Sequence, residues 1–135
     1  MNCVFCKILN KEIPSYKIYE DEYTYAFLDI AEDVDGHTLI IPKKHVCNVL
    51  DVDEETLTHV MNTTKKIMNH YVDDLKFDGC NILNASGEAA QQSVMHLHFH
   101  VIPRKNNDQI DGWPNYKGAK KSLKENHDFL KMYNE

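Results

Sequence analysis

Apolar and polar residues alternate from 95 to 101 within the run 94–102, where three histidines are spaced two apart with large apolar residues between them. Because successive side chains of a β-strand point to opposite faces, a strand here places His96, His98 and His100 on one face. The other face then carries Met95, Leu97, Phe99 and Val101. Three buried imidazoles would each need a partner for their ring nitrogens, whereas neutral imidazole is a good nucleophile, base or metal ligand. We therefore interpret this row as a functional site rather than as a strand with two buried faces.

The remaining pattern predicts a sheet and one long helix. β-rich runs occur at 16–19, 23–29, 38–42, 80–84 and 94–103, and the first three form an antiparallel meander. Apolar residues recur every three or four positions from 53 to 75, which predicts an amphipathic helix with Asp51 or Asp53 as its N-cap and a stop at Phe77-Asp78-Gly79. The first ten residues predict a short turn or helix, and a short helix is expected after Ala119. Because the long helix has one apolar face to bury, we expect an α+β fold.

Length and charge limit the classes of function. A chain of 135 residues predicts a single domain over 1–135, with a core over 1–104 and a C-terminal extension over 105–135. A net charge of −6 without a dense Lys/Arg block argues against a nucleic-acid partner, although a nucleotide is easily accommodated. We find neither a signal peptide nor a stretch of about 20 apolar residues, so we expect a cytoplasmic protein without a membrane partner.

Four cysteines, at 3, 6, 47 and 80, are too few for a secreted disulfide scaffold, and we expect reduced thiols. Cys3 and Cys6 form a Cys-x-x-Cys pair, which suits either metal binding or redox chemistry. The redox alternative requires a βα context that this N-terminus does not supply. Cys47 and Cys80 are expected to be small residues in or near the core.

Five segments in order resemble the histidine triad (HIT) family of nucleotide-binding hydrolases and transferases. They are Cys3-x-x-Cys6-Lys-Ile, Tyr25-Ala-Phe-Leu-Asp29-Ile30, Gly36-His37-Thr-Leu-Ile-Ile-Pro42-Lys-Lys-His45, Leu83-Asn84, and Gln92-Ser93-Val94 leading into the triad. The resemblance covers nearly the whole chain to about Arg104 and implies a HIT-like five-stranded antiparallel sheet with a long helix and a short N-terminal helix. It also implies a homodimer with a continuous sheet, acting on a purine nucleotide of the AMP type.

The resemblance assigns the nucleophile to His98, which attacks the α-phosphorus and forms a covalent nucleotidyl-histidine that water then hydrolyses, releasing AMP or another nucleoside monophosphate. Its second ring nitrogen is expected to donate to a backbone carbonyl on the same strand. His100 is expected to donate to the phosphate, and His37 to lie close to the triad. A structural histidine capping a turn is the alternative for His37.

Nucleotide-binding positions also follow from the resemblance. Asp29 is expected to accept from the ribose hydroxyls and Ile30 to line an apolar slot for the base. The phosphate or leaving group is assigned to Asn84, Gln92 and Ser93. Relatives commonly carry glycine where this chain has Gln91, and because positive φ is costly for glutamine, we expect its side-chain amide to replace a backbone contact.

In the branch of the family that carries the cysteine pair, two histidines complete a tetrahedral zinc site. By position these are His45 and His96, which gives a closed Cys2His2 set, the mark of a structural Zn²⁺ rather than a catalytic one. The resemblance thus implies a zinc ion that holds Cys3 and Cys6 against two strands. Removal of this ion is expected to lower the melting temperature.

Two other functions compete with a nucleotidyl hydrolase or transferase. One is a metal-dependent hydrolase whose ion is held by all three triad histidines, which would need a carboxylate that residues 96–104 do not contain. The other is a nucleotide-sensing or partner-binding module with vestigial catalysis. Within the enzyme hypothesis, adenosine phosphoramidates, aminoacyl adenylates and dinucleoside polyphosphates remain open as substrates.

Overall fold

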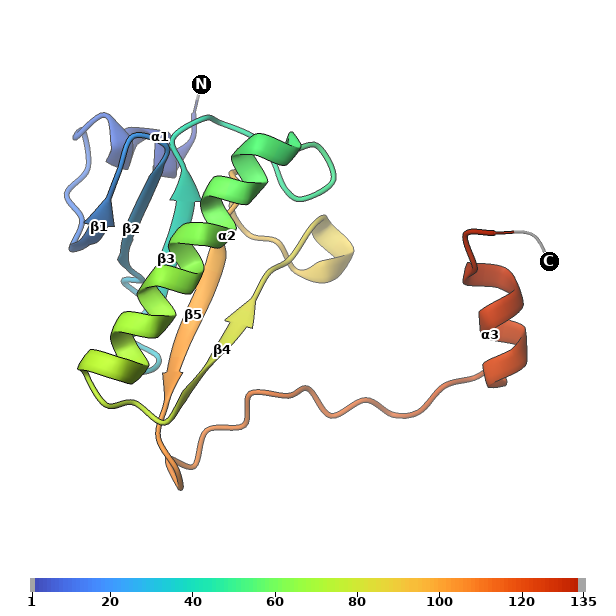
Figure 1. The fold of residues 1–135 in the computed structure, drawn as a ribbon. Coiled ribbons are helices and arrows are strands. Elements are labelled where there is room, and N and C mark those ends of the chain that lie inside the picture. Colours follow the sequence, from blue (N-terminus) through green and yellow to red (C-terminus); the bar gives the residue numbers. More distant parts are fainter. Residues whose placement is uncertain (1, 134–135) are drawn as a thin grey trace.

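A computed structural model describes residues 2–133. Five strands form one antiparallel sheet in the order β1-β2-β3-β5-β4 (Figure 1). Their bounds are Lys17–Glu20 (β1), Thr24–Leu28 (β2), Thr38–Pro42 (β3), Gly79–Leu83 (β4) and Phe99–Arg104 (β5). The α+β class and the five-stranded antiparallel sheet are therefore confirmed.

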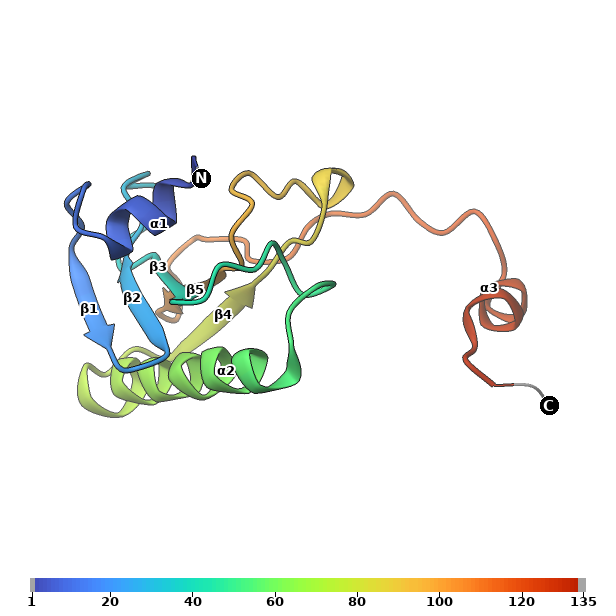
Figure 2. The same ribbon diagram turned by 90° about the horizontal axis from the view of Figure 1, so that it is seen from above.

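Two helices cover opposite faces of this sheet (Figure 2): α2 (Glu54–Asn69) lies on one side and α1 (Val4–Leu9) on the other. Alternate side chains of the strands point to opposite faces of the sheet, so each helix packs on its own apolar core. Ile40 and Val101 pack with Val60 and other residues of α2, whereas the neighbouring Leu39 packs with Phe5 of α1. The sheet thus separates a large core under α2 from a smaller one under α1, and the candidate site lies on the α1 side.

The long helix begins as predicted, because the Asp53 carboxylate accepts from the Thr56 backbone N–H at 3.0 Å. It also reaches the predicted end at Leu75, because α2 stops at Asn69 and continues as a π-helical turn, His70–Asp74. The wider turn keeps Tyr71 in the core, where its hydroxyl lies 2.6 Å from that of Thr38. Tertiary packing therefore sets the end of this helix.

The predicted strand over 94–103 is wrong in its first half, because β5 begins only at Phe99. Pairing with β3 ends at Ile40 and Phe99, and two residues beyond Ile40 the ring of His96 binds the carbonyl of Pro42 at 2.9 Å. The alternation of faces nevertheless persists. Leu97 and Phe99 belong to the core under α2, but Met95 is 47% exposed instead of buried with them.

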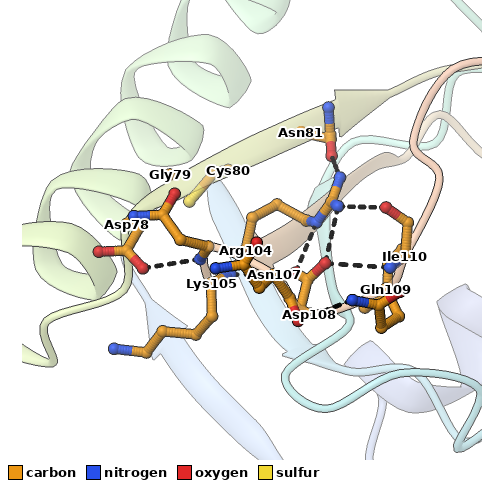
Figure 3. Close-up of a pocket in the computed structure, with 11 residues that line it drawn as sticks. Asp78, Gly79, Cys80, Asn81, Arg104, Lys105, Asn107, Asp108, Gln109 and Ile110 are labelled. Carbon is orange, nitrogen blue, oxygen red and sulfur yellow. Dashed lines mark hydrogen bonds and ion pairs between the residues drawn. The ribbon is translucent and has the colours of Figure 1, made fainter.

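A polar network closes the end of β5 (Figure 3). The Arg104 guanidinium binds the Asp108 carboxylate through two nitrogens, at 2.9 Å each, and also donates to Asn81 Oδ1 and the Ile110 carbonyl. The chain then runs away from the sheet to α3 (Leu123–Leu130), which begins with a Ser122–Glu125 capping box (Figure 1). The expected C-terminal helix thus forms. Within residues 2–133, no helix is both long and apolar enough to span a membrane.

Candidate active site

His98 lies at the end of the irregular segment that precedes β5, with only 8% of its surface exposed. Its Nδ1 is 2.8 Å from the carbonyl oxygen of His96, the kind of backbone acceptor that was expected. Because a carbonyl can only accept, Nδ1 carries the proton and Nε2 keeps its lone pair. Asn84 supports this arrangement by donating its Nδ2–H to the His98 carbonyl at 3.0 Å. The side-chain amide of Asn84 thus contacts backbone, where a phosphate or leaving-group contact was predicted.

Burial tunes the ring of His98 toward its neutral form. Loss of solvation lowers the pKa of His98 below its usual value, and the hydrogen bond to the His96 carbonyl opposes this only in part. The ring is therefore uncharged at neutral pH, as nucleophilic attack requires.

A cleft of about 290 Å³ opens beside His98. Its polar end is formed by His98, His100 and Asp29. Its apolar walls come from α1, β2 and β3, namely Val4, Phe5, Ile8, Phe27 and Leu39. Ser93 also lines the cleft, as does Ile30, which is 85% exposed and lies at the rim. The cleft thus joins an apolar slot to a group of imidazole and carboxylate side chains.

His37 reaches this polar end from the loop before β3. Its Nε2 lies 2.8 Å from His100 Nδ1 and 3.6 Å from Asp29 Oδ2. The loop can approach β5 because Gly36 has φ +80° and a Cβ built on it would lie 2.7 Å from Pro103 Cγ. His37 therefore contacts the site directly instead of only capping a turn.

Replacement of Gly36 by alanine is expected to destabilise the protein by about 2–5 kcal/mol, because left-handed strain costs about 1–2 kcal/mol and overpacking against Pro103 about 1–3 kcal/mol. Urea unfolding measures this loss. Gly79→Ala is the matched control, since nothing lies within 4 Å of a Cβ at Gly79, and its effect should stay within about 0.5 kcal/mol. Equal stability of the two variants would contradict the close packing at Gly36.

The backbone of Gln91, in the loop before the triad, differs from what was expected. Gln91 adopts the left-handed conformation that was predicted to be too costly, with φ 70° and ψ 29°. Its neighbours hold it there, because the Gln91 N–H donates to the Glu88 carbonyl at 2.9 Å and Gln92 is anchored in the interior. The amide of Gln92 donates to the carbonyls of Cys47 and Val94, at 2.8 and 3.0 Å. The Gln92 side chain, predicted to bind nucleotide, therefore fixes the loop.

Cys3, Cys6, His45 and His96 form a second cluster on the same side of the sheet, with all four ligand atoms within 4.8 Å of one another. Sγ of Cys3 is 3.4 Å from His96 Nδ1, and Sγ of Cys6 is 3.3 Å from His45 Nδ1. The two Nδ1 atoms are 3.1 Å apart. These are close to the separations of about 3.3–3.8 Å expected for nitrogen and sulfur donors around a tetrahedral Zn²⁺.

The chemistry of this donor set fits a cation. His96 is fully buried, and its Nε2 donates to the Pro42 carbonyl at 2.9 Å, so that its Nδ1 lone pair faces the cysteines. Burial and then the neighbouring Cys3 raise the pKa of the Cys6 thiol, which a bound cation would reverse. His96 thus faces the cysteines whereas His100 faces Asp29 and His37, and the three triad rings do not converge on one ion.

Two contributors to the site were not singled out from the sequence. Phe5 packs edge-on against the rings of both His96 and His98, with centroid distances of 5.8 and 5.1 Å. Asp33 accepts from His37 Nδ1 at 2.8 Å. The spacing of four residues between Asp33 and His37 was the available signal, but it brings them together only if the loop curls back.

Comparison with known proteins identifies relatives of this chain. A sequence profile described as the HIT domain matches residues 10–107. An adenosine 5'-monophosphoramidase, HNT1 of Saccharomyces cerevisiae, is 44% identical over 114 residues, which cover 83% of this chain and 70% of that protein. The profile begins after Cys3 and Cys6, so these two cysteines lie outside the matched region.

Solved structures agree with this relationship. A member of the HIT family from Bacillus subtilis superimposes with a TM-score of 0.82 and 38% identity, covering 96% of this chain and 92% of that one. A Zn-bound histidine triad family protein from Mycobacterium smegmatis superimposes with a TM-score of 0.78 and 39% identity, covering 85% of this chain and 84% of that one. From its sequence, its sheet and its row of histidines, this chain belongs to the HIT family.

Proposed function

We propose that this protein hydrolyses purine nucleoside 5'-phosphoramidates at the α-phosphorus through a covalent nucleotidyl-histidine on His98. In the first step Nε2 of His98 bonds to phosphorus and the bond from phosphorus to the amine breaks. In the second step water attacks phosphorus, the bond to His98 breaks, and a nucleoside monophosphate such as AMP leaves. The observation that carries this proposal is a buried, neutral His98 whose protonated Nδ1 is held by a carbonyl and whose ring lines the cleft.

The polar end of the cleft is suited to the rest of such a substrate. We assign His100 and His37 to the phosphate and leaving group, Asp29 to the ribose and Ile30 to the base. Ser93 and Asn84 stay predictions as phosphate contacts, and Asn84 also orients His98 through its backbone. The names of the yeast relatives favour a phosphoramidate, and a dinucleoside polyphosphate is the second candidate substrate.

We also propose a structural Zn²⁺ bound by Cys3, Cys6, His45 and His96. When bound, this ion would supply a closed tetrahedral link between α1 and the segments that carry the two histidines. A homodimer with a continuous sheet stays a prediction, for which support comes from edge strand β4, where Ile82 and Leu83 are 41% and 45% exposed. A cytoplasmic location likewise stays a prediction.

The direct test offers adenosine 5'-phosphoramidate and diadenosine tetraphosphate in parallel to the purified protein and follows release of AMP. We expect turnover of the phosphoramidate with a higher kcat/KM than that of the tetraphosphate. Turnover of the tetraphosphate alone would assign the site to polyphosphates. Binding of AMP without turnover of either compound would favour a nucleotide-sensing module instead.

A further inference from the structure

A chain of short hydrogen bonds leads from the β2–β3 loop into the cleft. Asp33 Oδ1 lies 2.8 Å from His37 Nδ1, and His37 Nε2 lies 2.8 Å from His100 Nδ1. A second carboxylate oxygen, Asp29 Oδ2, is 3.6 Å from the same Nε2 of His37. Asp33 does not line the cleft, so it can act on a bound molecule only through His37.

Asp33 determines which nitrogen of His37 carries a fixed proton. The hydrogen bond from His37 lowers the pKa of the Asp33 carboxyl, which is therefore ionised at neutral pH and can only accept. Nδ1 of His37 must then be the donor, and Nε2 is left as the nitrogen that gains or loses a proton. When His37 is neutral, its Nε2 accepts from Nδ1–H of His100, and Nε2 of His100 has a lone pair.

The same atoms could in principle hold a metal ion, since the ligand atoms of Asp29, His37 and His100 lie within 4.8 Å of one another. The distances argue for a shared proton. Two histidine nitrogens around a tetrahedral Zn²⁺ are about 3.3 Å apart, because each bond is about 2.0–2.1 Å long. The 2.8 Å between His37 and His100 is shorter than this and is a normal hydrogen-bond length.

We propose that Asp33 is a positioning residue that fixes the tautomers of His37 and His100, so that these two histidines relay one proton to the leaving group and recover it from the attacking water. The inference rests on the proposed function and deepens it. It assigns the proton transfers of both chemical steps to His37 and His100, whose hydrogen bonds lead to the Asp33 carboxylate outside the cleft.

The proton count balances over the two steps. Initially His37 is an imidazolium whose Nε2–H donates to His100 Nδ1, and His100 presents Nε2–H to the leaving amine. As the bond from phosphorus to nitrogen breaks, His100 protonates the amine and receives the proton of His37. In the second step His100 Nε2 takes a proton from the attacking water while its Nδ1–H returns to His37.

The surroundings favour the positive charge on His37 rather than on His100. Two carboxylates, Asp33 and Asp29, lie within 3.6 Å of the nitrogens of His37. For His100, burial and then the neighbouring histidines lower the pKa to about 4. A proton that enters the relay at His100 is therefore passed on to His37.

The test compares Asp33→Ala and Asp33→Asn with Asp35→Asn, a control that removes one exposed carboxylate from the same loop. On an alkylamine phosphoramidate of AMP, Asp33→Ala is expected to lower kcat about 10- to 100-fold and to leave KM within about threefold. This loss is smaller than the roughly 10²- to 10⁴-fold contribution of a general acid or base itself, because Asp33 acts through His37. On the p-nitrophenyl ester of AMP, the leaving group departs without a proton, so the relay must release its proton to solvent before His100 can accept one from water. The initial burst should keep its rate in the variant while steady-state turnover falls.

Asp33→Asn separates tautomer control from simple support of the loop. The amide is isosteric with the carboxylate but can donate to Nδ1 of His37 and so favour the opposite tautomer, and its loss of kcat should at least equal that of alanine. If Asp33 only supported the loop, Asp33→Asn would lose less kcat than Asp33→Ala. In ¹⁵N NMR of the substrate-free protein, recorded at a pH at which His37 is neutral, the proton of His37 should lie on Nδ1, and both variants should shift it toward Nε2.

Unchanged ¹⁵N signals of His37 in both variants, or losses of kcat no larger than in Asp35→Asn, would overturn the relay. Because the tautomer is read without substrate, it is independent of which nucleotide is cleaved. A wild-type protein that cleaves no phosphoramidate but has the expected tautomer would overturn the proposed function alone. Normal turnover with the wrong tautomer would overturn the relay alone.

Discussion

Substitution of His98 by alanine is expected to reduce turnover of adenosine 5'-phosphoramidate by about 10⁴-fold or more, which corresponds to about 5.5 kcal/mol of transition-state stabilisation. In the proposed mechanism the ring of His98 supplies the atom that bonds to phosphorus, and the other groups of the cleft only bind, orient or protonate. Initial rates of AMP release measure the loss. Trapping of labelled nucleotide on the wild-type protein, and its absence from the variant, would locate the covalent bond.

His70→Ala is the matched control, because His70 is an exposed histidine paired with Asp74, far from the cleft. It should retain the wild-type rate within about twofold. The His98 variant also removes a ring that packs on Phe5, so its folding and its metal content have to be measured alongside the rate. Equal rates for wild type and His98→Ala, in folded proteins of equal metal content, would exclude His98 as the nucleophile.

Loss of the proposed zinc ion is expected to lower the melting temperature by more than about 10 °C. Structural Zn²⁺ sites contribute apparent free energies of about 10–16 kcal/mol, comparable with the total stability of about 5–15 kcal/mol of a domain. The core under α2 does not depend on the metal ligands, so even a loss of only about 3 kcal/mol would produce this shift at about 4 °C per kcal/mol. Calorimetry with and without a chelator measures it.

Variants of the cysteines make the test specific. Cys6→Ser removes a proposed ligand, whereas Cys47→Ser removes a cysteine outside the cluster, whose Sγ lies 3.8 Å from Met95 Sδ and 3.7 Å from Asn48 Nδ2. We expect Cys47→Ser to keep stoichiometric zinc and an unchanged melting temperature. Cys6→Ser should lose its zinc and melt at a lower temperature. Full zinc content in Cys6→Ser, or an unchanged melting temperature after verified removal of metal, would rule out a structural site.

The sequence predicted the elements of this protein better than their ends. Alternation and helical periodicity located all five strands and the long helix, because burial of one face leaves a direct pattern in the chain. The start of β5 was missed since pairing with β3 ends at Phe99 and the ring of His96 instead binds the carbonyl of Pro42, a residue of another strand. The change from α- to π-helical geometry at His70 was missed for a similar reason, because the hydroxyl of Tyr71 pairs with Thr38 across the core.

Prediction of the site was limited in the same way. The order of the motifs predicted that two cysteines and two histidines share one zinc site, and the structure places these four side chains within one cluster. Asp33 could not be found, because its contact with His37 requires a loop conformation that Gly36 and Pro103 set together. The conformation of Gln91 was misjudged because the anchoring bonds of Gln92 override a local preference.

The position of Phe5 has a practical consequence for handling this protein. Phe5 lies between the proposed zinc ligands Cys3 and Cys6 in the chain and packs directly on the ring of His98. A tag fused before Met1 therefore lies a few residues from a side chain that touches the proposed nucleophile. Purification tags belong at the other end, where α3 lies well away from the sheet (Figure 1), and an inactive preparation with an N-terminal tag should first be remade without it.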